Sequence, residues 1–262
     1  MKAAIFFLSP IVLLGGAITD VQNAASWNLG ARVIAPGEIA TVLGSGFANF
    51  GVEVVNKQFP LPSTLGGVQV QFNGSPGGLL YVTPTQINVQ VPKSLVIGNA
   101  TVTVLYNNQV VATTTISVST QAPGIFAYFN GTISSPIITL ANGALVSMPG
   151  FPAVEVGPTG TYIVLYGSGF GPTNSDTFTG QPTQDTILLY QLISKNVSAA
   201  LDNVPIQVAY IGLSPGSVGL YQVNLYIPAT VKAGTHTLAL RIGGVDLPDI
   251  RVETITPIAV IK

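Results

Sequence analysis

A short glycine motif occurs twice in the chain, and both copies stand in the same context. The copies read VLGSGF at residues 42–47 and LYGSGF at residues 165–170. Each follows a turn of proline and glycine, Pro36-Gly37 or Gly157-Pro158, and an apolar, β-branched run. Each precedes a second repeated segment, QINVQVP at 86–92 or QVNLYIP at 222–228. Self-similarity of this kind is the signature of a duplicated structural unit. The sequence therefore predicts two domains built to one plan.

Apolar and polar residues alternate along several segments of both repeats. Residues 68–72, 87–91 and 235–242 show the period of two that is typical of a half-buried strand. Asn73-Gly74 predicts a hairpin turn, with residues 79–82 as the returning strand. Many short strands of this kind predict an all-β protein of two tandem immunoglobulin-like (TIG/IPT-like) antiparallel β-sandwiches.

The two repeats also indicate where the domains begin and end. We expect an N-terminal segment at 1–22, a first sandwich at 23–120, a connector with a β-hairpin at 121–153, and a second sandwich at 154–262. From the phenylalanine of each motif to the next repeated glutamine there are 39 residues in the first repeat and 52 in the second. The second sandwich therefore has an insertion of about 13 residues, which we place in the loop 171–203. Within that loop, residues 186–195 fit a helix and a strand equally well.

The N-terminus has the composition of a secretory signal. Met1-Lys2 precedes an apolar run from Ala3 to Ile18, which Pro10 interrupts. Cleavage after Ala17 or near residues 24–25 fits the small residues there. A spanning helix is disfavoured because it needs about 20 apolar residues. A retained apolar strand that packs into a neighbouring subunit is the other alternative. We expect a secreted protein of the cell surface without a transmembrane span.

The repeated glycines are predicted to be structural. A phosphate-binding loop would need a following helix N-terminus or a lysine, and neither motif has one. We expect positive φ angles at the glycines and core positions for the aromatic rings. These structural turn residues are Gly44, Gly46, Phe47, Gly167, Gly169 and Phe170.

The chain offers few groups for catalysis. It has no cysteine and one histidine, and charged residues make up 7% of it, against roughly 25% in an average soluble protein. Disulfides, thiolate nucleophiles and multi-histidine metal sites are thereby excluded. His236 is expected to be a surface residue of a strand. A net charge of −1 leaves no electrostatic basis for binding nucleic acid. We expect no enzymatic activity, no cofactor and no metal.

Two pairs of aspartates are the remaining candidates for chemistry. Asp246 and Asp249 flank Pro248, and Asp176 and Asp185 share the inserted loop. A glycosidase would need two converging carboxyl groups, but solvation of turns is the interpretation we favour for both pairs. With Asn174, the second pair is an alternative calcium site, although it lacks the spacing of an EF-hand loop.

The motifs resemble a known family. The GSGF segment after an apolar strand is similar to the opening of TIG/IPT domains. The sequence as a whole resembles the two-lobed C-terminal module of secreted acidobacterial-type proteins, over about 230 residues. The residues that carry the second resemblance are Asn23–Trp27 (NAASW), Ala35–Ile39 (APGEI), Leu65–Val68 (LGGV), Leu80–Pro84 (LYVTP), Gln86–Asn88 (QIN), Ala122–Phe126 (APGIF) and Gly212–Asn224 (GLSPGSVGLYQVN). This resemblance implies a secreted, immunoglobulin-like architecture and transfers no catalytic residues. In that family the module forms the tail of a larger protein, whereas here it follows the expected signal directly, so we expect the module itself to be functional.

These observations favour a non-enzymatic structural protein that associates with itself. Sheets rich in Thr, Val, Asn and Gln, with few charges, leave strand edges poorly guarded against pairing. Apolar end segments can add a strand to a neighbouring sheet, and head-to-tail contacts of that kind generate filaments. The candidate self-association residues are Ile5, Phe6, Phe7, Ile11, Val12, Ile258, Val260 and Ile261. The alternative is a monomeric adhesin module that binds carbohydrate or matrix polysaccharide, with several tyrosines as a stacking face.

Overall fold

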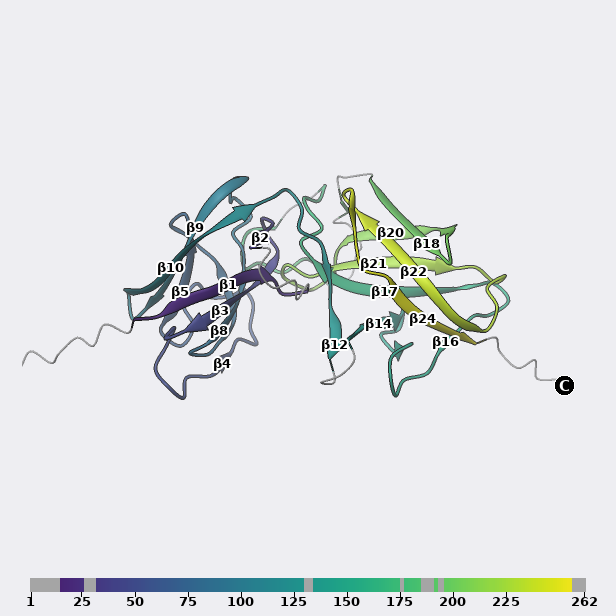
Figure 1. Cartoon of the computed structure of the whole chain (residues 1–262), viewed down its shortest axis with the longest axis horizontal. Helices are drawn as coiled ribbons and strands as arrows, with labels where there is room; N and C mark the ends of the chain where they lie inside the picture. The colour runs from purple at the N-terminus through teal and green to yellow at the C-terminus, as the bar shows by residue number, and fades with distance from the viewer. Residues whose placement is uncertain are drawn as a thin grey trace, which may run out of the picture.

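The computed structural model contains two β-sandwich lobes that follow one another along the long axis of the molecule (Figure 1). It describes residues 15–25, 32–129, 134–174, 177–184, 191–192 and 196–255. All regular structure in these ranges is β-strand. This confirms the predicted class, an all-β protein of two tandem immunoglobulin-like sandwiches.

Lobe 1 is formed by two five-stranded sheets. The first has the strand order β1 (Ala17–Asn23), β3 (Ile39–Ser45), β8 (Gln86–Gln90), β7 (Gly78–Val82) and β4 (Val54–Val55). The second has the order β2 (Val33–Ile34), β10 (Gln109–Val118), β9 (Gly98–Tyr106), β5 (Val68–Phe72) and β6 (Ser75–Pro76).

Lobe 2 repeats this plan. One sheet has the order β15 (Leu145–Val146), β14 (Ile138–Leu140), β17 (Thr161–Ser168), β21 (Tyr221–Ile227) and β20 (Val208–Leu213), and β11 (Gly124–Ile125) also pairs with β17. The other has the order β16 (Val154–Glu155), β24 (Ile250–Ile255), β22 (Gly234–Ile242), β18 (Val197–Leu201) and β19 (Val204–Ile206), with β23 (Val245–Asp246) beside β22. A separate ribbon pairs β12 (Ala127–Phe129) with β13 (Ser134–Pro136).

The two lobes share an unusual pairing. In each, a two-residue strand runs parallel to the last strand: β2 beside β10, and β16 beside β24. The other strand pairs of the described residues are antiparallel. β1 and β2 therefore lie in different sheets of lobe 1, as β14 and β16 do in lobe 2, and β3 and β17 are the respective neighbours of β1 and β14.

Two segments that the sequence placed outside the sandwiches belong to them. All of β1 but Asn23 lies in the segment expected at 1–22, yet this strand pairs with β3 and buries Val21 fully. The hairpin β14–β15 lies within the expected connector, yet it pairs with β17. β1 and the broken strand β11/β14 therefore serve as the first strand of their respective lobes. In lobe 2 that strand is interrupted by the ribbon β12–β13.

The hairpin turns follow the residues that can adopt a left-handed backbone. Asn73 and Gly74 have φ angles of 49° and 83°, and Asn107 and Asn108 have 49° and 63°. These are the angles of a two-residue hairpin turn. The returning strand after Asn73-Gly74 is nevertheless β6 rather than residues 79–82. At Gly77 the chain crosses to the other sheet, where a Cβ would overlap Val89.

Most sheet edges are too short for strand addition. In the part of the chain that the structure describes, the four larger sheets have eight edge strands, of which five have two residues and β19 has three. Pro76 in β6 and Pro205 in β19 also remove a backbone donor at the edge, which is a common protection against pairing. The expectation of poorly guarded edges is therefore wrong for these strands. Only β1 and β20 are longer, with seven and six residues.

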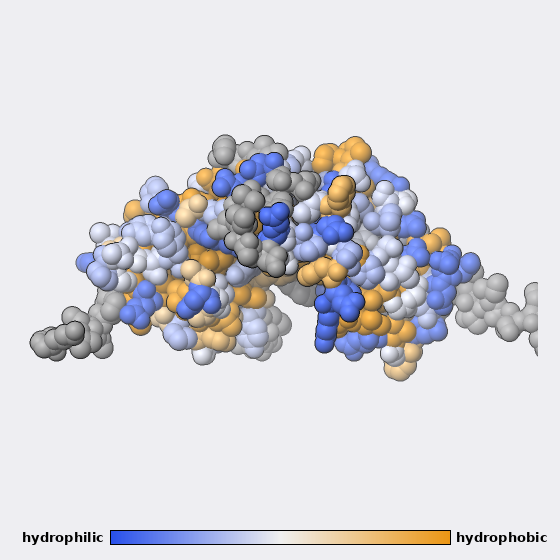
Figure 2. Space-filling view, turned by 180° about the vertical axis from the view of Figure 1, so that it is seen from behind, coloured by the Kyte–Doolittle hydropathy of each residue, from blue (hydrophilic) through white to orange (hydrophobic). Residues whose placement is uncertain are grey.

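Each lobe encloses its own apolar core between its two sheets. The largest fully buried side chains occur in both cores and include Phe47 and Phe72 in lobe 1 and Phe170 in lobe 2. The exterior is mixed, and hydrophobic and hydrophilic residues alternate over both lobes (Figure 2). In the described part of the chain there is no helix that could cross a membrane.

Candidate functional site

The two GSGF segments end equivalent strands, β3 and β17, and have the same local geometry. Phe47 and Phe170 are fully buried in their respective cores. Gly46 and Gly169 have φ angles of 67° and 75°, a region that L-residues rarely adopt. The second glycine of each copy is thus required by the backbone.

The first glycine of each copy has a different role from the expected one. Neither Gly44 nor Gly167 has a positive φ angle, so that expectation is wrong for both. At Gly44 a Cβ would overlap the Ala17 carbonyl group and the Phe47 ring, and at Gly167 it would overlap the Gly124 carbonyl group and the Phe170 ring. These glycines let the phenylalanine fold back beneath the first strand of its lobe.

The serines of the two motifs are in opposite environments. Ser45 is exposed, whereas Ser168 has 0% exposure. The Ser168 hydroxyl accepts a hydrogen bond from the backbone N–H of Ile39 at 2.8 Å and donates one to the Gly219 carbonyl at 3.0 Å. Ile39 belongs to lobe 1 and Gly219 to lobe 2. One copy of the motif therefore forms the junction between the lobes.

Asn23 extends this junction from the end of β1. Its amide nitrogen donates to the carbonyl oxygens of Ala122 at 2.7 Å and Ser168 at 3.0 Å, and it lies 3.3 Å from Oε2 of Glu38. Its own oxygen accepts the Ala25 N–H at 2.7 Å. Asn23 is 2% exposed. One buried amide therefore connects the first strand of lobe 1 to the connector at Ala122 and to lobe 2 at Ser168.

Glu38 is a buried carboxyl group at the centre of the junction. Its exposure is 0%, and Oε2 accepts the Ala35 N–H at 2.9 Å. Burial raises the pKa of Glu38 well above its ordinary value, against the smaller lowering effects of the hydrogen bonds from Ala35 and Asn23. A carboxyl group in such a site is favoured in its neutral form. Oε1 has no hydrogen-bond partner among the described residues.

The inserted loop of repeat two provides a second set of contacts between the lobes. The backbone of Gly180 donates to Oε1 of Gln90 at 2.6 Å and accepts from the Leu61 N–H at 2.9 Å. Thr177 and Thr179 accept hydrogen bonds from the ammonium group and the backbone N–H of Lys93, at 2.8 and 3.1 Å. We call residues 177–184 the insertion arm. It lies against lobe 1, so the insertion serves the junction.

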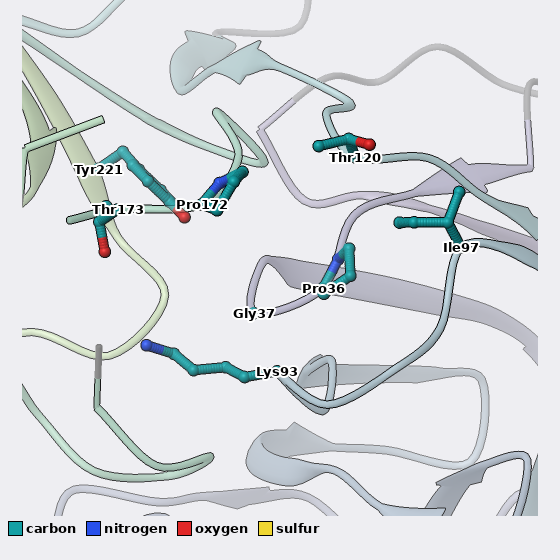
Figure 3. Close-up of a pocket in the computed structure, with 8 residues that line it drawn as sticks. All are labelled: Pro36, Gly37, Lys93, Ile97, Thr120, Pro172, Thr173 and Tyr221. Atoms are coloured by element: carbon teal, nitrogen blue, oxygen red, sulfur yellow. The ribbon is translucent and has the colours of Figure 1, made fainter. Parts of the chain in front are cut away.

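A small cavity remains beside these contacts (Figure 3). Its volume is about 200 Å³, below the roughly 300 Å³ at which ligand pockets begin. Lobe 1 and lobe 2 both contribute to its wall, and the lining residues are Pro36, Gly37, Lys93, Ile97, Thr120, Pro172, Thr173 and Tyr221. Its size and its mixed lining fit a packing gap at a junction better than a binding site.

His236 is more enclosed than a surface strand residue. Its side chain is 13% exposed, and Nδ1 lies 2.6 Å from Oδ2 of Asp202. Nε2 lies 3.0 Å from both the Lys232 carbonyl and Oγ1 of Thr254. Thr254 is 3% exposed and donates to the same carbonyl at 2.7 Å. The Thr254 hydroxyl is thus buried, and its proton is used in the hydrogen bond to the Lys232 carbonyl. The cluster joins three chain segments instead of activating a nucleophile.

The charge state of this cluster follows from its contacts. Burial of the ring lowers the pKa of His236, but the hydrogen bonds to Asp202 and Lys232 and the charges of Asp202 and Glu253 outweigh it, so the pKa is raised. The pKa of Asp202 is lowered, first by the Thr237 N–H and then by His236. The pair is therefore stabilised as imidazolium and carboxylate.

Several other candidates are separated in the fold. Tyr210 and Tyr221 are buried, and burial raises the pKa of Tyr210 to about 12. Tyr226 packs on Tyr162 with a centroid distance of 5.2 Å, while Tyr81 lies in lobe 1. The described tyrosines therefore share no stacking face. No group of three or more His, Asp or Glu residues that could hold a metal is found in the described ranges.

Some predicted residues lie outside the described residues. These are all eight candidates for self-association, Ile5, Phe6, Phe7, Ile11, Val12, Ile258, Val260 and Ile261. The same holds for Asp176 and Asp185 of the alternative calcium site, and for the segment 186–195 except Gln191 and Leu192.

No protein-family model matches the chain, and a search of curated proteins finds no match. Among solved structures, SGBP-B of the Bacteroides ovatus mixed-linkage glucan utilization locus, in complex with a mixed-linkage heptasaccharide, is 11% identical with a TM-score of 0.33, over 86% of this chain and 43% of that one. The plexin A4 extracellular region is 12% identical with a TM-score of 0.29, over 92% and 18%. Domains 5–6 of the S-layer protein SbsC are 14% identical with a TM-score of 0.26, over 86% and 93%. The chain spans less than half of the first two structures. Similarity at this level carries no information about function.

The junction was not predicted from the sequence, although differences between the repeats mark it. Alignment of the two motifs places Glu38 opposite Thr161 and Gln90 opposite Tyr226. A glutamate and a glutamine at the ends of otherwise duplicated strands are therefore specific to lobe 1. Such departures are the signal that could have indicated a specialised surface.

Proposed function

We propose that this chain is a non-enzymatic structural module of the cell exterior, a rigid building block of two sandwiches that associates with further copies. The observation that carries the proposal is the buried polar junction of Asn23, Glu38 and Ser168. Buried polar groups are satisfied only in one relative arrangement of their partners. A junction of this kind favours one fixed angle between the lobes.

A fixed angle suits a structural role. A flexible linker between domains loses conformational entropy when subunits are placed in an ordered assembly. Here the second lobe follows the first with hydrogen bonds at two places, the GSGF loop and the insertion arm. The subunit would therefore enter an assembly already ordered. The low charge of the chain, 7%, would also reduce repulsion between closely packed copies.

The short and proline-containing sheet edges limit how such copies would meet. We assign the contacts to the apolar C-terminal segment that contains Ile258 and Ile261, which secretion leaves in place, rather than to β4, β6 or β19. An apolar segment can add to a neighbouring sheet beside one of its longer edges, β1 or β20. Secretion, with an N-terminal signal, is part of this proposal.

The association is tested with the full chain by sedimentation velocity over a wide range of concentrations, together with negative-stain microscopy. We expect larger species or filaments as the concentration rises. The double variant Ile258→Asp/Ile261→Asp should remain monomeric, because charge opposes burial of the segment. Val204→Asp at the proline-containing edge is the matched control and should associate as the unmodified chain does.

Two results would contradict the proposal. Monomers at every concentration would remove self-association. Association that is lost in the Val204→Asp variant and kept in the Ile258→Asp/Ile261→Asp variant would place the contacts on a sheet edge instead of the end segment.

A further inference from the structure

Charged residues gather on one outer face of lobe 2. The whole chain has 9 Lys and Arg residues and 10 Asp and Glu residues. Five of these charged residues lie within residues 241–253: Arg241, Asp246, Asp249, Arg251 and Glu253. The alternating burial of β22 and β24 points Arg241 and Arg251 outward, away from the core. The equivalent strands of lobe 1, β9 and β10, have no charged residue.

Two hollows lie on this face and meet at Asp249. The first has a volume of about 470 Å³ and is lined by Asp249, Arg251 and Glu253 together with the segment 147–153 and the ribbon residues 135–136. The second has a volume of about 390 Å³ and lies over β18 and β22, beside Arg241 and Asp246. Because Asp249 lines both, the two hollows adjoin, and we call the pair of hollows the groove. It lies against β22 and β24, which are yellow in Figure 1.

Each hollow contains a paired arginine and carboxylate. In the first, Nε of Arg251 donates to Oε1 of Glu253 at 2.7 Å. In the second, Arg241 donates to both oxygens of Asp246 at 2.8 Å. Such pairs present donors and acceptors side by side, and their charges largely cancel. Asp249 adds one further carboxylate, so the groove has a small negative balance.

An aromatic ring is held over the first hollow by a tight turn. The N–H of Phe151 donates to the Met148 carbonyl at 2.9 Å, across Pro149 and Gly150, whose φ angle is 85°. Before the turn, Ser147 has a φ angle of 57°, and its hydroxyl accepts the Glu253 N–H at 2.6 Å. Phe151 is 44% exposed despite this fixed position. Because the turn holds the Phe151 ring partly in water, the folded chain forgoes the free energy of burying it. The ring is therefore available to a ligand, and its fixed position lowers the entropy cost of binding.

We propose that this groove binds a neutral polysaccharide chain. An exposed ring can stack on the apolar face of a sugar, and the arginine–carboxylate pairs can exchange hydrogen bonds with adjacent hydroxyl groups, which are both donors and acceptors. Two adjoining hollows suit a polymer with successive sugar units. The small negative balance disfavours acidic polysaccharides. The inference is independent of self-association, because the groove lies within one lobe.

The test is affinity electrophoresis of the full chain through gels that contain soluble β-glucan, xylan, galactomannan or dextran, with alginate as the acidic comparison. We expect retardation by at least one neutral polymer and none by alginate. Loss of the ring in Phe151→Ala should weaken binding about tenfold, which corresponds to the loss of one aromatic contact. Asp249→Ala should also weaken it, since Asp249 lines both hollows. Phe50→Ala, a fully exposed ring of lobe 1, is the matched control and should bind as the unmodified chain does.

Circular dichroism of each variant shows whether it folds, and Phe151→Tyr, which keeps a stacking ring, should retain binding. No retardation by any neutral polymer would overturn the proposal. Retardation that is unchanged in both Phe151→Ala and Asp249→Ala, or that occurs with alginate alone, would overturn it as well. Sedimentation at the same concentration distinguishes the failure of this proposal from the failure of self-association. A monomer that binds polysaccharide would contradict self-association and leave the groove proposal in place.

Discussion

The two lobes share the order of their central strands, the same parallel short strand and the same GSGF turn, yet their ends differ. In lobe 2 the motif serine is buried against lobe 1, whereas in lobe 1 the motif serine is exposed. The receiving end of lobe 1 has Glu38 and Gln90, and lobe 2 has Thr161 and Tyr226 at the aligned positions. Duplication therefore preserved the interior of the sandwich, and divergence at the ends created a single specific junction.

This difference also limits how the molecule could polymerise. If both ends had kept the same polar groups, the junction could repeat from one copy to the next. Tyr162 and Tyr226 instead form an aromatic pair at the far end of lobe 2. A contact between copies would therefore use different chemistry from the contact within one copy.

The largest expected effect concerns what the lobes share. Phe47→Ala and Phe170→Ala each remove a fully buried ring and should lower the stability of their own lobe by about 3–5 kcal/mol. Denaturant unfolding and, independently, scanning calorimetry would measure the loss of stability. If one of the two variants were neutral, the motif would not have an equivalent structural role in both lobes.

The next effect concerns what distinguishes them. Ser168→Ala removes a buried hydroxyl with partners in both lobes and should cost about 1–3 kcal/mol, because the Ile39 N–H loses its acceptor. Ser45→Ala at the equivalent exposed position should stay within about 0.5 kcal/mol. Small-angle scattering should show a wider range of interlobe angles for Ser168→Ala alone. Equal effects of the two substitutions would contradict the assignment of the junction.

The pH dependence of Glu38 is a smaller effect. Its pKa is raised in the folded protein, so the folded state holds a proton that the unfolded state releases first. Stability should therefore be fully present below the ordinary glutamate pKa, and should fall as the pH rises from there towards the folded pKa. Glu38→Gln keeps a neutral side chain of the same shape, and its stability should vary less over that range. Identical pH profiles for the two proteins would show that folding does not raise the pKa of Glu38.

The smallest effect concerns His236 in β22. Its raised pKa means that its contribution is present below the ordinary histidine pKa and is lost as the pH rises through the folded pKa. Thermal unfolding of His236→Gln should lack this decrease. The chemical shifts of the imidazole would report the folded pKa directly, and a value below that of a free histidine would contradict the ion pair with Asp202.

Much of the architecture could be predicted because it depends on local patterns. Alternation along residues 68–72 and 87–91 predicted strands, and Asn73-Gly74 predicted a hairpin turn with the observed φ angles. The first glycine of each motif was interpreted incorrectly, as a positive-φ position. A side chain is excluded there because a carbonyl group of β1 or β11 lies too close. Both strands lie in segments that the sequence analysis placed outside the sandwiches, so this contact could not be predicted.

Repetition and the period of the side chains were enough to predict the number of lobes, their all-β class and the burial of the motif phenylalanines. The three-dimensional fold was needed to show that β1 and the expected connector supply the first strand of each lobe. It also decided that one of two identical GSGF segments is a junction and the other is exposed. Identical local sequence cannot distinguish them, since the difference lies in which surface meets Ser168, and that surface comes from residues more than 100 positions away.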